Sequence, residues 1–421
     1  MAEAENKELY INFDEYIRQG EPSRREAAYA WSTAIGLQAV DGLRTSEYLH
    51  QTARRHIEGE ITIDEARQQL KEYYESRVSR TTDEADMEEA DRVSANIVKV
   101  LSSPTLDFST SGYLSVHRRV FDGVLKHAGE LRNYDITKRE WVLEGDTVRY
   151  LNWEDLRRAL DYDLEQERAY SYSGKTNDEL ITHLSRFVAN LWQVHAFREG
   201  NTRTTAVFAI QYLRSLGFAV ENDLFAKHSW YFRNALVRAN YANVKKNIDF
   251  TPVYLERFFR NLLLGDRWVL RNRYLHIRPA AEWSLQPNLA TPSSTPSSTP
   301  SSTPSSTPSS TPSSAEQVLY KHRTSTVQAP SKFRTGINSL FYTDNKLILK
   351  LVEVIGTRQC SIRDMLEGVG LKDRRNFIDY HLTPAIAEGF VRLLYPDKPR
   401  HPRQRYLLTM KGTLLYNELN E

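Results

Sequence analysis

The chain has 421 residues, more than one typical domain, so two or three folding units are expected. Apolar residues make up 40% and charged residues 26%, a composition that favours a globular protein over a disordered or membrane-embedded one. The net charge of +2 excludes a uniformly basic or acidic chain. After position 314, however, 17 basic and 11 acidic residues give a local net charge of +6, so the C-terminal unit is expected to have partners of its own.

Targeting and redox signals are sparse. The first ten residues are acidic and lack the apolar region of a signal peptide. No run approaches the roughly 18 apolar residues that cross a bilayer. The single cysteine, Cys360, excludes an internal disulfide and a cysteine-based zinc site. We therefore expect a cytoplasmic protein with no membrane partner.

The first unit, residues 1–80, reads as a small helical bundle. An alanine-rich helix is predicted to end at Gly42. A turn at Gly59 is followed by a second helix, whose start carries a capping-box pattern in Thr62 and Glu65.

The next unit, residues 81–286, begins with an acidic helix start and contains one predicted hairpin. Residues 140–143 and 148–151 flank Glu144-Gly145-Asp146, a turn sequence that contains glycine. An isolated hairpin is marginal unless it packs or pairs. Taken by itself, it reads as a peripheral loop.

The most informative stretch is His195-Ala196-Phe197-Arg198-Glu199-Gly200-Asn201-Thr202-Arg203. Apolar residues recur at helical spacing before it, and again after it up to Gly217, so it is predicted to form a tight turn between two buried helices. Free amides from Asn201 to Arg203 at the start of the second helix would cradle phosphate. An imidazole, a carboxylate, a carboxamide and a guanidinium are the groups needed for nucleotidyl or phosphoryl transfer. Alternatively, His195 is a helix cap, and Glu199 and Arg203 form an ordinary ion pair.

The C-terminal half starts with a spacer. TPSS repeats six times from Thr291 to Ser314, which predicts an extended linker over residues 287–316. Residues 317–421 then show three helices and two short strands around a basic loop, and this pattern resembles a winged helix-turn-helix domain. In that arrangement the third helix enters a DNA groove and the loop reaches phosphates. The candidate DNA-binding residues are Arg374, Arg375, Asn376, Arg400, Arg403 and Arg405. Protein binding or dimerisation is the alternative.

The nine-residue motif is similar to the HxFx(D/E)GNGRxxR signature of Fic proteins, which transfer nucleoside monophosphates to protein hydroxyls. The resemblance covers about residues 85–278 and departs twice, because Thr202 replaces the second glycine and Ala206 the second arginine. It implies a mainly α fold: a Fic-type helical core with a β-hairpin flap, here followed by the winged helix domain.

The resemblance also implies roles for individual residues. His195 would be the general base, and Glu199 would hold Mg²⁺. ATP would be bound by Gly200, Asn201, Thr202 and Arg203 at its phosphates, with Tyr231 and Asn234 as candidates for the adenine pocket. The flap would pair with a target strand and present its hydroxyl, through Thr147, Val148, Arg149 and Tyr150.

The N-terminal bundle resembles the Vbh-type antitoxin module, in which an (S/T)xxxE(G/N) helix sends its glutamate toward the nucleotide site. The matching positions are Leu37 to Gly42, so Asp41 and Gly42 are the candidate inhibitory residues. The usual partner of the glutamate is the second motif arginine, which is Ala206 here. Inhibition is therefore expected to be weak or to use another contact.

The resulting prediction is an enzyme that transfers AMP from ATP to a Ser, Thr or Tyr hydroxyl of a target protein. Two alternatives stay open: a DNA-bound regulator whose Fic-like unit only senses nucleotide, and a transferase that uses UTP, GTP or a phosphocholine nucleotide. The sequence also leaves open whether the chain forms a homodimer.

Overall fold

The computed structural model describes residues 13–76, 81–103, 105–218, 220, 224–277, 341–396 and 398–420. The chain divides into two compact units, Met1–Leu285 with Asn338–Glu421, and Gln286–Ile337. The second unit, and with it the linker expected over residues 287–316, lies outside the described residues.

The N-terminal segment is helical, as predicted. Its elements are α2 (Asp14–Gln19), α3 (Pro22–Gly36), the 3-10 helix η1 (Leu37–Asp41), α4 (Glu47–Ile57) and α5 (Ile63–Glu75). Gly42 ends η1 in the left-handed conformation at φ 74°, where a glycine costs least. The capping box of Thr62 and Glu65 is present, which confirms that prediction.

The central region is a bundle of helices connected by short 3-10 turns. Its helices are α6 (Thr82–Leu101), α7 (Thr110–Val120), α8 (Leu156–Ala169), α9 (Asn177–Val194), α10 (Asn201–Ser215), α11 (Leu224–Lys227), α12 (Ser229–Ala239) and α13 (Val253–Phe259), which continues as a π-helical turn, η5 (Arg260–Leu264). The 3-10 turns are η2 (Trp141–Leu143), η3 (Trp153–Asp155), η4 (Val244–Lys246) and η6 (Asn272–Leu275).

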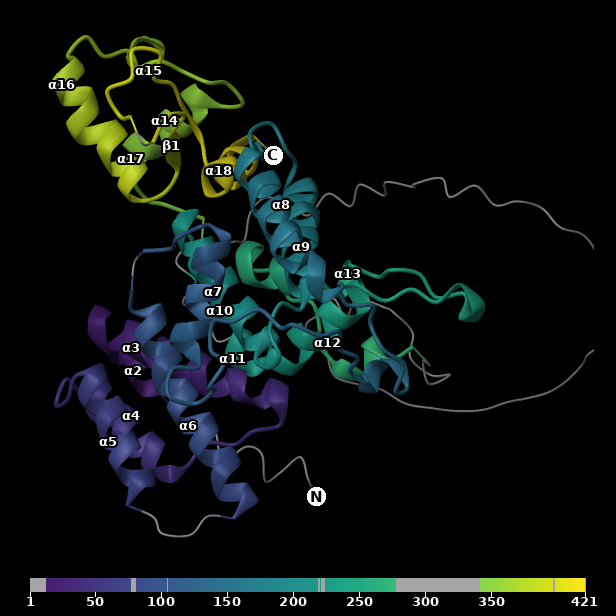
Figure 1. The fold of residues 1–421 in the computed structure, drawn as a ribbon. Helices are drawn as coiled ribbons and strands as arrows, with labels where there is room; N and C mark the ends of the chain where they lie inside the picture. The colour runs from purple at the N-terminus through teal and green to yellow at the C-terminus, as the bar shows by residue number, and fades with distance from the viewer. Residues whose placement is uncertain are drawn as a thin grey trace, which may run out of the picture. The chain divides into compact units, whose positions relative to one another are not determined.

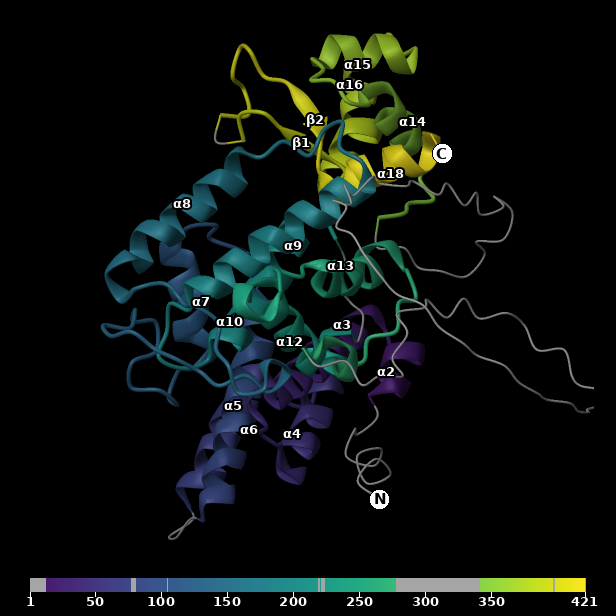
Figure 2. The same cartoon turned by 90° about the vertical axis from the view of Figure 1, so that its right-hand side faces the viewer.

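Helix α10 forms the centre of this bundle. Every residue from Asn201 to Leu213 is buried, because α6, α7 and α9 pack around it (Figure 2). The N-terminal α3 packs against α6 and α11, so the N-terminal segment reaches the same core (Figure 1). Gly36 sits at this contact, where a Cβ atom would lie 2.5 Å from the Ala226 backbone.

The β-hairpin expected over residues 140–151 is wrong. Residues 141–143 form the 3-10 turn η2, and residues 147–151 form no strand. The physical reason is competition for the backbone groups. The carbonyl of Val142 accepts from Ile277 N, and that of Arg149 accepts from Gln193 Nε2. Because distant partners satisfy these groups, the segment is a packed loop rather than a ladder.

The C-terminal region contains the expected three helices followed by two strands. The helices are α14 (Lys346–Ile355), α15 (Ile362–Val369) and the continuous run of α16 (Arg374–Phe377), η7 (Ile378–Leu382) and α17 (Thr383–Ala387). Strands β1 (Val391–Leu393) and β2 (Tyr406–Leu408) pair antiparallel with Val391 opposite Leu408, and α18 (Met410–Asn420) follows.

The fold class is therefore mainly α, as predicted. Among the described residues, β1 and β2 make the one sheet. No helix in the described ranges combines the length and the apolar character that crossing a membrane requires.

Candidate active site

The motif turn is held in an unusual backbone conformation. Helix α9 ends at Val194, and His195 follows at φ 49°, in the left-handed region that few residues other than glycine adopt. Gly200, at φ 73°, then forms the N-cap of α10. A Cβ atom at Gly200 would lie 2.1 Å from the ring of Phe121, so only glycine fits there. The turn thus brings the candidate base close to a helix N-terminus, as the sequence predicts.

Asn201 closes the turn on itself. Its side-chain Oδ1 accepts from Phe197 N at 2.9 Å, and its Nδ2 donates to Phe197 O at 2.7 Å. Both ends of the amide are therefore engaged with the backbone of one motif residue. In this structure the carboxamide, which is expected to contact phosphate, fixes the shape of the loop.

Phe197 anchors the turn in the core. Its ring is fully buried and stacks on His117, with centroids 3.8 Å apart. His117 accepts from Gly129 N at Nδ1, so its other ring nitrogen carries the proton and donates to the carbonyl of Glu199 at 3.1 Å. Burial lowers the pKa of His117 to about 4, which keeps this neutral tautomer across the physiological range.

His195 lies between two aromatic rings. The centroid of Tyr150 is 4.0 Å away, and the Trp192 ring is perpendicular to the imidazole at 5.3 Å. Only 3% of His195 is exposed, and neither ring nitrogen has a hydrogen-bond partner among the described residues. Burial lowers its pKa well below the usual value, and the charges of Lys138, Arg132 and Arg233 lower it further. The imidazole is thus neutral and free to accept a proton.

Arg132 binds the backbone of the turn and of the segments beside it. Its guanidinium donates to the carbonyl oxygens of His195 (2.8 Å), Tyr134 (2.7 Å), Val194 (3.4 Å) and Leu151. These carbonyls include the C-terminal end of α9, which otherwise lacks donors. Neither Arg132 nor His117 was identified from the sequence, because a single Arg or His far from the motif carries no local signal.

Thr202, at one of the two departures from the signature, makes a specific contact. Its hydroxyl accepts from the indole Nε1 of Trp192 at 3.0 Å, in the core. Trp192 in turn packs edge-on against both His195 and Tyr150. The extra side chain is therefore part of the packing that surrounds the imidazole.

Arg203 is occupied by acidic and amide groups. Its Nε lies 2.8 Å from Asp41 Oδ2, its Nη1 donates to Gln38 Oε1 at 2.9 Å, and its Nη2 donates to Glu89 Oε1 at 2.8 Å. Asp41 and Gln38 belong to the N-terminal segment and Glu89 to α6. The contact of Asp41 is thus with the first motif arginine, while Ala206 is buried in the core. Gln38 and Glu89 were not identified from the sequence.

Glu199 is the exposed carboxylate of the site. Its side chain is 60% exposed and lies 3.7 Å from Lys138 Nζ. No cluster of three or more potential ligands that could hold a metal by itself occurs among the described residues. Mg²⁺, however, is commonly bound by one or two carboxylates together with substrate phosphates. An accessible carboxylate next to a helix N-terminus fits that mode.

The loop expected to be the flap contacts His195 through the ring of Tyr150. Val148 is buried, Arg149 is exposed, and Thr147 N donates to Asp146. The hydroxyl of Tyr150 donates to Glu140 Oε1 at 3.2 Å. Glu140 is fully buried and receives two bonds from Arg233, at 2.7 and 3.2 Å. The loop is thereby tied to α12.

The two candidates for an adenine pocket lie in the core. Tyr231 is 2% exposed and donates to Tyr254 O at 3.3 Å. Asn234 is fully buried and donates to Asn272 Oδ1 at 2.9 Å. The structure does not bring either one to an exposed surface.

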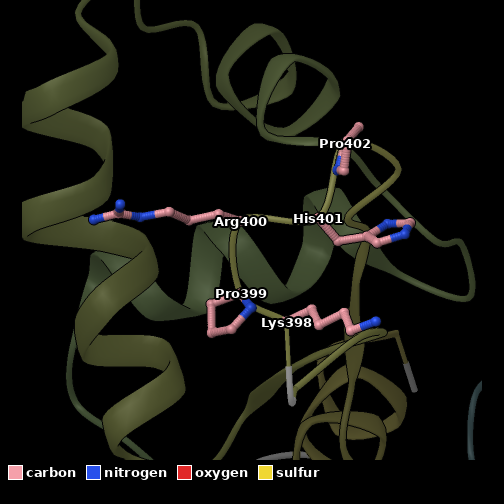
Figure 3. Close-up of a pocket in the computed structure, with 5 residues that line it drawn as sticks. All are labelled: Lys398, Pro399, Arg400, His401 and Pro402. Atoms are coloured by element: carbon pink, nitrogen blue, oxygen red, sulfur yellow. The ribbon is translucent and has the colours of Figure 1, made fainter.

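The C-terminal candidates are all exposed. Arg375 pairs with Asp379 at 3.8 Å, and Arg405 with Asp364 at 3.7 Å. The loop between β1 and β2 forms a shallow pocket, in which Arg400 extends to the opposite side from Lys398 and His401 (Figure 3). The six candidates, on α16 and in this loop, are Arg374, Arg375, Asn376, Arg400, Arg403 and Arg405.

Comparisons with known proteins agree with the motif. Residues 107–213 match the family model of the Fic/DOC family, and residues 346–409 match the model of the Filamentation induced by cAMP protein Fic-like, C-terminal domain. The chain thus contains a Fic domain, followed by a Fic-like C-terminal domain. Domains of the Fic/DOC family generally transfer a nucleoside monophosphate onto proteins.

The solved structures that are similar to the chain include the following two. One is a Fic family protein from Desulfovibrio desulfuricans G20, with 16% identity over 96% of this chain and 94% of that chain, and a TM-score of 0.36. The other is the N-terminal Fic domain of a Bartonella effector protein from Bartonella sp. AR 15-3, with 17% identity, 41% and 81% coverage, and a TM-score of 0.33. No curated protein matches the chain.

Proposed function

We propose that this chain transfers AMP from ATP to a Ser, Thr or Tyr hydroxyl of a target protein. The observation that carries the proposal is His195, a buried imidazole without a hydrogen-bond partner among the described residues, next to an exposed carboxylate and a helix N-terminus. A buried polar group is normally paired, so an unpaired imidazole at this place points to a ligand or a substrate proton.

In the proposed reaction, His195 accepts the proton of the target hydroxyl as its oxygen attacks the α-phosphate. A bond forms between that oxygen and phosphorus, the bond to pyrophosphate breaks, and the imidazole then releases the proton to solvent, which restores the neutral base. The lowered pKa of His195 keeps the ring neutral near pH 7, the state in which it can accept a proton.

The phosphates would be held by the N-terminus of α10 and by Arg203, while Glu199 would hold Mg²⁺. When bound, Mg²⁺ neutralises phosphate charge and helps pyrophosphate to leave. Asn201 and His117 contribute by positioning, because they fix the loop that carries Glu199 and Gly200.

Regulation by the N-terminal segment is part of the proposal. A guanidinium that already binds Asp41, Gln38 and Glu89 has to give up these contacts before it can bind a phosphate. We therefore propose that the domain of residues 1–80 inhibits the Fic domain of residues 81–286 through Arg203. Because Ala206 replaces the arginine that usually binds the inhibitory glutamate, inhibition is expected to use another contact. We propose that this contact is the one between Asp41 and Arg203.

Label transfer tests the enzyme. The full chain is incubated with ATP labelled at the α-phosphate, Mg²⁺ and a cell lysate. The variants His195→Ala and Asp41→Asn/Glu89→Gln are assayed in parallel. The double variant, called the lock variant below, removes the two carboxylates that contact Arg203. We expect label on protein that disappears with His195→Ala, and more label with the lock variant. Unchanged labelling by His195→Ala would contradict the role of the imidazole. If label is transferred from UTP or GTP but not from ATP, the enzyme is a transferase with that nucleotide as its donor.

A second function is proposed for residues 317–421, namely DNA binding by a winged helix arrangement. The supporting observation is the exposure of the basic side chains on α16 and in the β1–β2 loop. Phosphate contacts make binding steeply salt-dependent. Fluorescence anisotropy with duplex DNA should show weaker binding and a shallower salt dependence for Arg400→Ala/Arg403→Ala. Equal binding by wild type and variant would refute the assignment and favour a protein partner.

A further inference from the structure

Three cations lie close enough to His195 to lower its pKa, namely Lys138, Arg132 and Arg233. The three side chains differ in how strongly their present partners bind them. Arg132 is buried, and its guanidinium is used by backbone carbonyls. Arg233 is bound to Glu140, whose carboxylate is fully buried. Moving Arg233 toward a ligand would leave that carboxylate without a cation in the core, which is strongly unfavourable.

Lys138 has no such constraint. Its side chain is 31% exposed, and its ion-pair partner Glu199 is 60% exposed at 3.7 Å. An exposed pair at this distance contributes little, so Lys138 can turn to another anion at small cost. An ammonium has three donors on a flexible stem and binds phosphate oxygens as a point charge.

The backbone around Lys138 is fixed at both ends. On one side Arg132 binds the carbonyl of His195, and on the other Glu140 binds Arg233 of α12. The segment between them is therefore attached to the motif turn at one end and to α12 at the other. This explains why one exposed lysine lies next to both the candidate base and the candidate metal carboxylate.

Among the described residues that form this site, few side-chain cations are available to contact the phosphates of a bound nucleotide. Arg203 is one positive group for a polyanionic ligand, and it is shared with two carboxylates. Position 206, about one helical turn further along α10, is a buried alanine. Arg198 donates to Asn133 Oδ1 at 3.4 Å. Of the site's described side chains, this leaves Lys138 as the cation that can turn to a triphosphate beside the proposed metal at Glu199.

We propose that Lys138 is a phosphate-binding residue of the nucleotide site, whose ammonium contacts a phosphate oxygen of the bound nucleoside triphosphate beside Glu199. This inference rests on the proposed transferase function and names a binding residue for it. Since the contact is with phosphate, it does not depend on which base the donor carries.

Calorimetric titration tests the inference by binding alone. The ligands are a nucleotide analogue with a methylene group between the α- and β-phosphates, in the presence of Mg²⁺, and adenosine, which has no phosphate. The full chains are wild type, Lys138→Met, Lys138→Arg and the neighbour control Arg139→Met. All four are also made with Asp41→Asn/Glu89→Gln, so that Arg203 is available.

We expect Lys138→Met to weaken binding of the analogue roughly tenfold, as for a lost charge-assisted bond. Lys138→Arg keeps the charge and should stay within about threefold of wild type. Arg139→Met should bind the analogue like wild type, because its side chain is an exposed neighbour without a role in the site. Adenosine binding should be the same for all chains.

The alternative outcomes are distinct. If Lys138→Met binds the analogue like wild type, the role of Lys138 is refuted and the transferase proposal stands. If adenosine binding falls together with analogue binding, the lysine supports the fold and does not bind phosphate. If neither the wild-type chain nor the lock variant binds the analogue at all, the nucleotide site itself is refuted, and Lys138 with it.

Discussion

The carboxylate of Asp41 lies 2.8 Å from Nε of Arg203 and thereby joins the N-terminal segment to the motif helix α10. The guanidinium is almost fully buried, so the pair is shielded from solvent on one side. Glu89 and Gln38 complete the set of partners. A residue expected to bind phosphate is thus held by groups of the same chain.

The first prediction concerns this lock. Replacing Asp41 with Asn and Glu89 with Gln removes both charges that compete with phosphate for Arg203. We expect the double variant to transfer label about tenfold faster than wild type or more, with smaller gains for each single variant. The reason is that Glu89 accepts a charge-assisted hydrogen bond, worth about 1.5–3 kcal/mol, and Asp41 adds an ion pair. Initial rates of label transfer measure this.

The matched control for the lock is Asp86→Asn, a charge removal at an exposed position of the same helix α6. It should leave the rate unchanged. Equal acceleration by Asp86→Asn would show that net charge, rather than the contact with Arg203, controls the rate.

The second prediction concerns Thr202. Thr202→Val removes the acceptor of Trp192 Nε1 and leaves a buried donor unpaired, which costs about 1–3 kcal/mol of unfolding free energy. Transfer should fall as well, because Trp192 packs against His195. Thr202→Ser keeps the hydroxyl, so its unfolding free energy and transfer rate should be closer to those of wild type than to those of Thr202→Val. Urea denaturation and transfer rates measure the two effects.

Thr204→Val is the control for this experiment. The hydroxyl of Thr204 is buried and has no hydrogen-bond partner among the described residues, so its removal should be neutral or stabilising. A loss of stability as large as that of Thr202→Val would mean that the shape of threonine matters at both positions, rather than the bond to Trp192.

The third prediction concerns the buried pair of Glu140 and Arg233. Arg233→Met should cost about 3–5 kcal/mol of unfolding free energy, because it leaves a fully buried carboxylate without its cation. Arg233→Met/Glu140→Leu removes both charges and should be less destabilised than Arg233→Met alone. Urea denaturation of the two variants decides this, and a double variant that is less stable than the single one would contradict it.

The fourth prediction concerns pH. Burial raises the pKa of Asp91 to about 6 from the usual 3.8, although its carboxylate accepts bonds from Ser46 and Tyr74 of the N-terminal segment. Because the folded-state pKa is the higher one, this contribution to stability is fully present below about pH 4 and is lost as the pH rises through about 6. The loss amounts to about 3 kcal/mol at 1.36 kcal/mol for each pKa unit.

Asp91→Asn isolates this effect. The difference in unfolding free energy between wild type and Asp91→Asn, measured by denaturant titration at pH 4 and pH 7, should shift in favour of the variant at the higher pH. A difference that is constant over this range would show that Asp91 titrates normally in the folded protein.

The sequence alone was sufficient where the deciding interactions are local. The two helices around the motif follow from apolar spacing, and the caps at Thr62 and Gly42 follow from residues within a few positions of each other. The tight turn between these helices, which carries Gly200 at the N-cap of α10, belongs to the same class. These features depend on backbone geometry that a short segment defines by itself.

The tertiary structure alone decided the rest, because the relevant partners are far apart in the chain. The loop of residues 140–151 has the pattern of a hairpin, but Ile277 and Gln193 satisfy its backbone groups. In the same way, the sequence predicts a phosphate-binding guanidinium at Arg203, and packing of η1 and α6 against α10 decided that carboxylates would meet it. Local spacing determines which side-chain and backbone groups a segment presents. Only packing determines which of these groups are paired with distant residues of the chain.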